Sequence, residues 1–279
     1  QKFSLIITYN SIVDSKISYY WIGDGGDWND GAHWSLTSGG VAAAAVPGPD
    51  NRVVFDENSF SGNGATITMT QSQDCYSVRW FAQEATNLSM SGHELTVIES
   101  FLLLSSQITL ITPGTINFLG SPDTNYQVGL NNNLFSNLSL KFTGNNSKWS
   151  VTGDFSADKI TLVQGKVELT GGKSKVNTIN SSGVLTKGLS LLDAELSGLQ
   201  SLSMDLTSAT LEAKNSSIKV VTASPVYSLN FGSNDYAGLI NISSGEVLLL
   251  GSGSIGKVEG KGILRVSGNH FFKNFSLDG

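Results

Sequence analysis

The chain has 279 residues, a formal net charge of −6 and 14% charged residues, well below the roughly 25% of ordinary globular proteins. Hydrophobic residues make up 39%, too many for a disordered chain. The absence of a basic run argues against a nucleic-acid surface, and no apolar stretch approaches the roughly 18 residues of a membrane span. Its 31 glycines and its wealth of Ser, Thr and Asn favour strands and turns over helices.

Residues 1–82 differ in composition from the rest. They hold four of the five tryptophans and the turn Pro47-Gly-Pro49, whereas residue 83 onward shows short apolar alternations broken by Gly, Asn and Ser. We therefore predict an N-terminal cap with the first strands over residues 1–82 and a series of β repeats over residues 83–279.

The most distinctive stretch is aromatic. It contains Trp21, Trp28 and Trp34 with His33 next to the last. The favoured interpretation is a hydrophobic plug that covers the first coil of a repeat protein, because such proteins need capped ends. The alternative is a sugar-stacking platform, since indole faces bind the CH surfaces of pyranose rings.

The loop between these tryptophans is rich in oxygen ligands and glycine. Asp24, Asp27, Asn29 and Asp30 carry the side chains that a Ca²⁺ site uses, but their spacing is not that of an EF-hand loop. The alternative is a set of Asx-turns, in which each side chain bonds its own backbone. A calcium site is the weaker of these two hypotheses, and no other cofactor is expected.

From residue 83 onward, apolar residues recur with the period of two that is typical of half-buried strands. Such alternation predicts strands at 88–90, 95–97, 108–110, 116–118, 138–142, 149–151, 160–162, 167–169, 202–204, 211–213 and 218–220. An internal repeat supports this: residues 160–171 read ITLVQGKVELTG and residues 240–251 read INISSGEVLLLG. The repeated unit is a strand, a tight turn with glycine, and a second strand.

Two architectures fit many short strands. Antiparallel sandwich repeats usually join their strands by Asn-Gly or Asp-Gly turns, which from residue 83 onward occur only as Asp278-Gly279. Low charge and small polar outer faces suit stacked coils, in which like residues lie about 4.8 Å apart. We therefore predict a right-handed parallel β-helix, with roughly eight or nine coils of about 20–25 residues in the repeat region.

The sequence shows no catalytic pattern. The single cysteine, Cys75, is expected to be a buried apolar residue, and the three histidines are scattered. Acids in the repeat region are isolated, as expected for solvated strand faces: Glu99, Asp154, Asp158, Glu168, Glu195, Asp205, Glu212, Glu246 and Glu259. We therefore predict a protein without enzymatic activity.

The N-terminal order of motifs resembles a known module. Trp21-Ile-Gly-Asp-Gly-Gly-Asp-Trp28 is followed by Pro49-Asp-Asn-Arg-Val-Val-Phe55-Asp and then by Cys75-Tyr-Ser-Val-Arg-Trp80. This resembles the opening module of large surface proteins of the Bacteroidota, which read W-I-G-G-x-G-x-W, then D-x-V-x-F-D, then C-x-x-(V/I)-x-W. The similarity covers most of residues 19–172.

The resemblance implies a function and a place. Family members are exported by the type IX secretion system and include attachment and gliding-motility adhesins. The chain is thus expected to be an extracellular, outer-membrane-associated adhesin or stalk segment. Expected partners are a surface glycan or solid substratum and the secretion or motility machinery. The alternative is a carbohydrate-binding or polysaccharide-degrading β-helix.

The C-terminal end carries one further expectation. The family's secretion domain has no counterpart before Gly279, and residues 275–279 still read as repeat sequence. A solenoid that stopped there would expose an open strand edge. We therefore expect the chain to be the N-terminal portion of a longer polypeptide, or a partner to cover this end.

Overall fold

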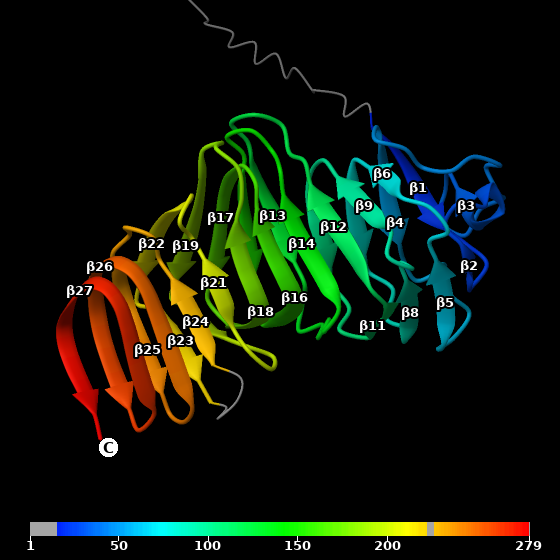
Figure 1. The fold of residues 1–279 in the computed structure, drawn as a ribbon. Coiled ribbons are helices and arrows are strands. Elements are labelled where there is room, and N and C mark those ends of the chain that lie inside the picture. The colour runs from blue at the N-terminus through cyan, green and yellow to red at the C-terminus, as the bar shows by residue number, and fades with distance from the viewer. Residues whose placement is uncertain (1–15, 222–225, 279) are drawn as a thin grey trace, which may run out of the picture.

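The computed structural model describes residues 16–221 and 226–278. Among these residues it contains 27 strands and a single short 3-10 helix, η1 (Gly31–His33). The strands stack along one axis, with the N-terminal strands at one end and β27 at the other (Figure 1). The protein is therefore an elongated all-β solenoid.

The first sheet runs along much of the solenoid. Its ten strands are β1 (Ile17–Trp21), β3 (Trp34–Ser35), β4 (Asn51–Phe55), β7 (Ser77–Trp80), β10 (Phe101–Leu103), β13 (Asn125–Gly129), β15 (Lys148–Thr152), β17 (Gly165–Thr170), β19 (Lys187–Leu192) and β22 (Thr210–Lys214). The ladder continues from β4 through β7 to β10 without a break, so the stacking crosses residue 82.

Two further sheets complete the coils. The second has four strands: β2 (Gly26–Asp27), β5 (Ala65–Thr68), β8 (Thr86–Ser89) and β11 (Ile108–Thr112). The third contains β6 (Gln73–Cys75), β9 (Glu94–Val97), β12 (Gly114–Phe118), β14 (Leu138–Phe142), β16 (Phe155–Leu162), β18 (Lys173–Ser181), β20 (Glu195–Ser197), β21 (Ser203–Asp205), β23 (Ser217–Val220), β24 (Tyr227–Asn230), β25 (Tyr236–Ile242), β26 (Glu246–Gly260) and β27 (Ile263–Leu277).

Neighbouring strands run parallel. The exceptions in the described chain are the antiparallel pair β1–β3 and an isolated bridge between Ser35 and Ala42. The parallel β-helix prediction is therefore confirmed, with about nine coils, and the sandwich alternative is wrong. Coil length varies more than expected: the long coil that leads from Phe101 to its partner Val128 contrasts with the short one from Leu249 to Val266.

Long strands of the third sheet bend around a corner of the solenoid. Residues of β16 on either side of Asp158 pair with two successive parts of β18. One coil later those two parts of β18 pair with separate strands, β20 and β21. Where no loop interrupts the corner, one continuous strand therefore forms part of two faces of the solenoid.

The core lies inside the coils and follows the predicted alternation. In β14, Leu138, Leu140 and Phe142 are buried while Ser139 and Lys141 face outward. Equivalent residues stack from coil to coil: the rings of Phe118 and Phe142 are nearly parallel, with centroids 4.8 Å apart. Each such side chain contributes about 1.5–3 kcal/mol on burial, and the core extends along the stacked coils.

The two copies of the internal repeat do not occupy equivalent positions in the solenoid. Gly165 and Gly245 both occupy a corner, with positive φ of 80° and 88°. When the two repeat sequences are aligned, Leu249 corresponds to Leu169. In the structure, however, Leu249 belongs to the ladder of Ile160, which runs through Ile179, Met204 and Leu229. The second copy is thus displaced by one face around the solenoid.

Two asparagines join neighbouring coils. The Asn133 side chain is buried; its amide nitrogen donates to the Ser105 and Leu130 carbonyls at 2.7 and 2.8 Å, and its Oδ1 accepts from the Ile108 amide at 3.2 Å. Asn234, which is half-buried, repeats this pattern farther along the solenoid, where it donates to Ala209 and Phe231 and accepts from Leu211. These contacts satisfy backbone groups at corners where the ladder hydrogen bonds are interrupted.

Candidate functional site

The N-terminal motif folds into an aromatic cluster at one end of the solenoid. Trp21, Trp28 and Trp34 are 0%, 2% and 0% exposed. The Trp34 ring stands edge-on to those of Trp21 and Trp28, with centroids 5.0 Å away in each case. Phe55 and Trp80 extend the cluster: their rings stack with centroids 3.9 Å apart, and the Phe55 ring lies within 6.0 Å of the rings of Trp21, Trp28 and Trp34.

Two of the indole N–H groups bond to the loop that carries them. The Trp21 Nε1–H donates to the Asp24 carbonyl at 2.6 Å, and the Trp34 Nε1–H donates to the Trp28 carbonyl at 2.7 Å. His33 stacks on Trp21 with centroids 4.9 Å apart. A Cβ atom at Gly26 would lie 2.0 Å from the His33 Nε2, so the packing of the imidazole requires glycine there.

This burial decides between the two interpretations of the tryptophans. A pyranose ring stacks on an open indole face, and the three indoles leave almost no surface exposed to solvent. The hydrophobic plug fits the structure and the sugar-stacking platform does not. The sequence could not decide this point because the same aromatic spacing serves both purposes.

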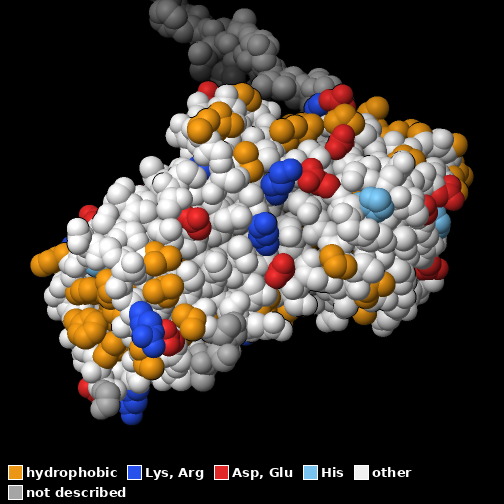
Figure 2. Space-filling model, viewed as in Figure 1, with side chains coloured by type: hydrophobic (Ala, Val, Ile, Leu, Met, Phe, Trp, Pro, Cys, Tyr) orange, Lys and Arg blue, Asp and Glu red, His pale blue; other side chains and the backbone are white. Residues whose placement is uncertain are grey.

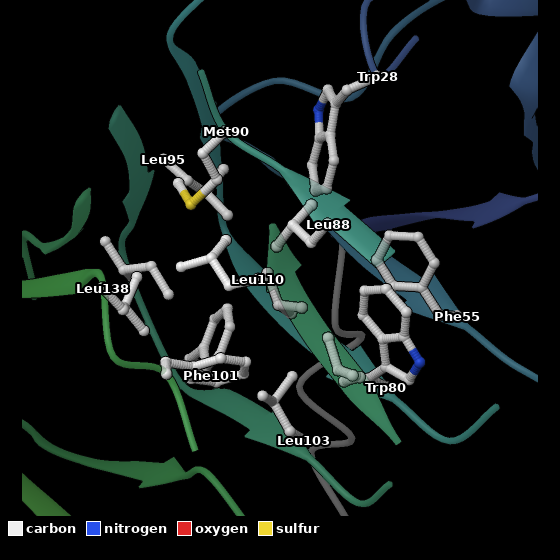
Figure 3. A pocket seen from close by; sticks show the side chains of 14 residues that line it. Trp28, Phe55, Trp80, Leu88, Met90, Leu95, Phe101, Leu103, Leu110 and Leu138 are labelled. Atoms are coloured by element: carbon white, nitrogen blue, oxygen red, sulfur yellow. The ribbon is translucent and has the colours of Figure 1, made fainter. Parts of the chain in front are cut away.

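A small cavity lies behind the plug (Figure 3). Apolar side chains line it, among them Trp28, Trp80, Met90, Phe101 and Leu138. Its volume is about 20 Å³, which is near the lower limit for a single water molecule, and an apolar cavity of this kind stays dry. It is a packing defect between the plug and the first coils rather than a ligand site.

Two of the four candidate calcium ligands, Asp24 and Asp30, accept hydrogen bonds from protein groups. Asp24 accepts hydrogen bonds from the backbone amide and the hydroxyl of Ser61, and these bonds, the backbone one foremost, lower the pKa of Asp24. Asp30 caps η1 and accepts from the Ala32 amide at 2.9 Å. Asp30 therefore organises a local turn, whereas Asp24 joins its loop to the one that contains Ser61.

The other two candidates form a separate polar group. Asp27 accepts from the Asn29 amide at 2.9 Å and from the Thr70 hydroxyl at 2.8 Å. Asn29 in turn donates to Thr70 at 2.6 Å and accepts from the side chain of Gln73. The Asx-turn alternative therefore holds for Asp27 and Asp30, whereas the side chains of Asp24 and Asn29 bond to residues more than 35 positions away. No group of three or more His, Cys, Asp or Glu side chains in the described chain could hold a metal ion.

Cys75 is buried in the core, as predicted from the sequence. Its side chain is fully buried, and this burial, with a smaller contribution from Asp74, raises the pKa of the thiol. A thiol kept protonated in the core is a poor nucleophile. It packs as a small apolar residue of the first coils.

The acids of the first sheet are less isolated than the sequence indicated. Lys148 Nζ lies 2.7 Å from a Glu168 oxygen, and Lys166 Nζ lies 3.6 Å from Glu168 and 2.9 Å from Glu212. Ser190 also donates to Glu212, at 3.0 Å. The sequence shows the close spacing of Lys166 and Glu168. It does not show that Glu212 lies on the same outward row as Glu168, because that alignment depends on the lengths of the two following coils.

This ion-pair ladder makes a pH-dependent contribution to stability. The hydrogen bond from Lys166 chiefly, and then that from Ser190, lowers the pKa of Glu212, while Glu212 raises the pKa of Lys166. Stabilisation by Glu212 is thus fully present above its unfolded pKa of about 4.3 and is lost as pH falls through the folded value. Stabilisation by Lys166 is lost only as pH rises above its ordinary range.

We expect Glu212→Gln to lower the urea midpoint at pH 7 and to leave it close to that of the unsubstituted protein at pH 3. The measurement is urea unfolding followed by circular dichroism at both pH values. Glu57→Gln, in the exposed loop after β4, is the matched control and should change neither midpoint. A Glu212→Gln effect of equal size at both pH values would contradict the assignment.

Three acids on or beside strands of the third sheet bond to the next coil. Asp154 accepts from the Lys173 amide at 2.8 Å, and Asp158 accepts from the Asn177 side chain at 3.0 Å. Farther along, Asp235 accepts from the amide and the hydroxyl of Ser254. These contacts are between successive coils, so the acids hold the solenoid together and do not converge on a common cleft.

Comparison with known proteins adds no relative. No protein-family model matches the chain, and neither the curated proteins nor the solved structures contain a match. The resemblance to the Bacteroidota module stays a prediction. Within the described ranges, the structure contains no helix with the length and hydropathy of a membrane span.

Proposed function

We propose that this chain is a non-enzymatic, extracellular stalk or adhesin segment of a bacterial surface protein, exported by the type IX system and used in attachment or gliding. The observation that carries the proposal is the continuous parallel stacking from β4 to β27, which makes the molecule a rod. Hydrogen bonds along the axis join each coil to the next, so such a rod resists bending and proteolysis.

The outer face of the third sheet suits attachment to a neutral surface. One outward row crosses successive coils and consists mainly of short hydroxyl side chains, with one lysine among them: Thr115, Ser139, Lys159, Thr178, Ser203 and Ser228. Figure 2 shows this face as mostly uncharged, with scattered Lys or Arg and Asp or Glu side chains of both signs. Short side chains lose little conformational entropy when a surface binds them, and a face without strong charge suits a neutral glycan or a solid substratum.

A flow-chamber experiment tests the proposal. Beads coated with the purified chain should remain on glycan-coated or bare glass at a shear that removes albumin-coated beads. The double variant Ser203→Glu/Ser228→Glu puts two like charges on the outward row and should reduce retention, while Thr210→Glu, on the first sheet, should not. Retention no better than albumin would refute the attachment role.

A polysaccharide-degrading activity is the competing outcome. Reducing-sugar release from plant, algal or bacterial polysaccharides would overturn the non-enzymatic part of the proposal. We expect none, because the acids described above are bound in ion pairs and turns.

A further inference from the structure

An open groove crosses the beginnings of four strands in the middle of the solenoid. The strands are β15, β17, β19 and β22, which are neighbours in this order in the first sheet (Figure 1). The groove has a volume of about 330 Å³, which is in the range of small-ligand sites. Its lining includes Asn146, Lys166, Thr186, Lys187, Gly188 and Thr210.

Lys187 is a buried cation without an anionic partner. Its side chain is 3% exposed, and its Nζ donates to the carbonyls of Gly183 and Leu185 at 2.8 and 2.7 Å. An ammonium group has three donors, so one N–H is left without a protein acceptor among the described residues. No carboxylate there forms an ion pair with Lys187, and desolvation lowers the pKa of its ammonium group. A buried charge of this kind calls for a counter-ion.

The neighbouring lysines are already neutralised. Lys148 and Lys166 share Glu168, and Lys166 also contacts Glu212, so two ammonium groups face two carboxylates. The charge of Lys187 is therefore the excess charge beside the groove. A partly desolvated charge attracts an anion more strongly than an exposed lysine does, because water screens it less.

The groove also offers space and uncharged polar groups. Gly188 lies between Lys166 and Thr210 on an outward row, and its missing side chain leaves the floor open. Asn146 and Thr186 are exposed, and their side chains have no hydrogen-bond partner in the part of the chain that the structure describes. An amide and a hydroxyl beside a positive charge suit the hydroxyls and the carboxylate of an acidic sugar.

We propose that this groove binds an acidic sugar residue, with the ammonium of Lys187 as the counter-ion of its carboxylate. Asn146 and Thr186 bond to the hydroxyls of the sugar ring. A small inorganic anion or acetate meets the charge but not these polar groups, so it binds more weakly. The inference does not depend on the attachment role, which concerns neutral surfaces and the third sheet.

Calorimetric titration with a tetramer of galacturonic acid tests the proposal. The tetramer should bind saturably at one per protein, and its affinity should fall between about 20 mM and about 300 mM salt, because salt screens the attraction. Two matched ligands separate the contributions. A glucose tetramer has the ring hydroxyls without the charge and should not bind, and acetate has the charge without the ring and should bind at least about tenfold more weakly than the galacturonic acid tetramer.

Three variants of the protein locate the site. Lys187→Met removes the buried charge and should weaken binding of the acidic tetramer about tenfold or more, the equivalent of about 1.4 kcal/mol. Thr210→Glu leaves the contacts of Lys187 with the 183–185 loop in place and puts a carboxylate on the exposed rim, so it should weaken binding as well. Lys175→Met removes an exposed lysine of β18, on the third sheet, and should leave the affinity unchanged. Circular dichroism checks that all three fold.

Several results would overturn the proposal. One is absence of binding by the acidic tetramer, and another is an unchanged affinity in both Lys187→Met and Thr210→Glu. A third is an equal loss in Lys175→Met, because the general charge of the surface would then explain the attraction. Acetate that bound as tightly as the tetramer would contradict the assignment of a sugar.

Discussion

Replacing Trp34 by alanine should destabilise the N-terminal end by about 3–5 kcal/mol, the usual cost of removing a fully buried tryptophan. The Trp34 ring makes edge contacts with Trp21 and Trp28, and its Nε1–H donates to the Trp28 carbonyl. Its loss leaves a cavity in the plug and an unsatisfied carbonyl. Since solenoid coils are stabilised mainly by their neighbours, the first coils should unfold before the others.

Urea unfolding followed by two signals tests this expectation. Four of the five tryptophans lie within residues 1–82, so fluorescence reports on the plug, while circular dichroism reports on all coils. The fluorescence midpoint should fall by more than the dichroism midpoint. Phe81→Ala, at a 41% exposed side chain beside the plug partner Trp80, is the control and should have a small effect. Equal effects of the two substitutions would show that Trp34 does not close the end.

Replacing Asn133 by leucine should cost about 3 kcal/mol although it adds an apolar side chain to the interior. The substitution leaves the Ser105 carbonyl and the Ile108 amide without this partner, while the Leu130 carbonyl keeps its bond from the backbone amide of residue 133. A buried polar group without a hydrogen bond costs about 1–3 kcal/mol, which outweighs the gain from the apolar surface. Leucine at Asn234 should have a smaller effect of the same sign, because water reaches that half-buried corner.

Chemical denaturation of the Asn133→Leu variant measures the cost of the lost hydrogen bonds. Asn125→Ala, at an exposed position in β13, is the control for removing an asparagine that makes no such contacts and should change stability little. Asn133→Asp adds a test by pH. Burial raises the pKa of a carboxyl, so the variant should lose most stability above about pH 4, where an unfolded aspartate ionises. A stable Asn133→Leu protein would mean that water replaces the side chain between the coils.

The local periodicity of the sequence predicted eleven strands between residues 88 and 220, and each of them overlaps a strand of the structure. The alternation in Leu138–Phe142 reappears as the buried and outward residues of β14. The turns were equally informative, because the scarcity of hairpin dipeptides favoured the parallel arrangement over the sandwich. These features depend on residues close together in the chain, and a single sequence contains that information.

Contacts between coils were harder to predict. Glu212 meets Lys166, which lies two coils earlier, and Asn133 meets the corner at Ser105. Such pairs depend on the length of each coil, which differs widely between the coil after Phe101 and the coil after Leu249. One extra residue in a corner loop moves every later residue along its face, and no local pattern records that shift.

Sequence alone determined that the chain is a β-rich solenoid with alternating inner and outer side chains, because strand period and turn chemistry are local properties. Tertiary structure decided which residues meet: it buried Trp21, Trp28 and Trp34 as a plug, bound the acidic loop into turns, and displaced the second repeat by one face. It also buried Lys187 without a carboxylate partner among the described residues. The physical reason is that burial and pairing depend on which residues stack on one another in neighbouring coils. That alignment depends on the lengths of all the preceding coils.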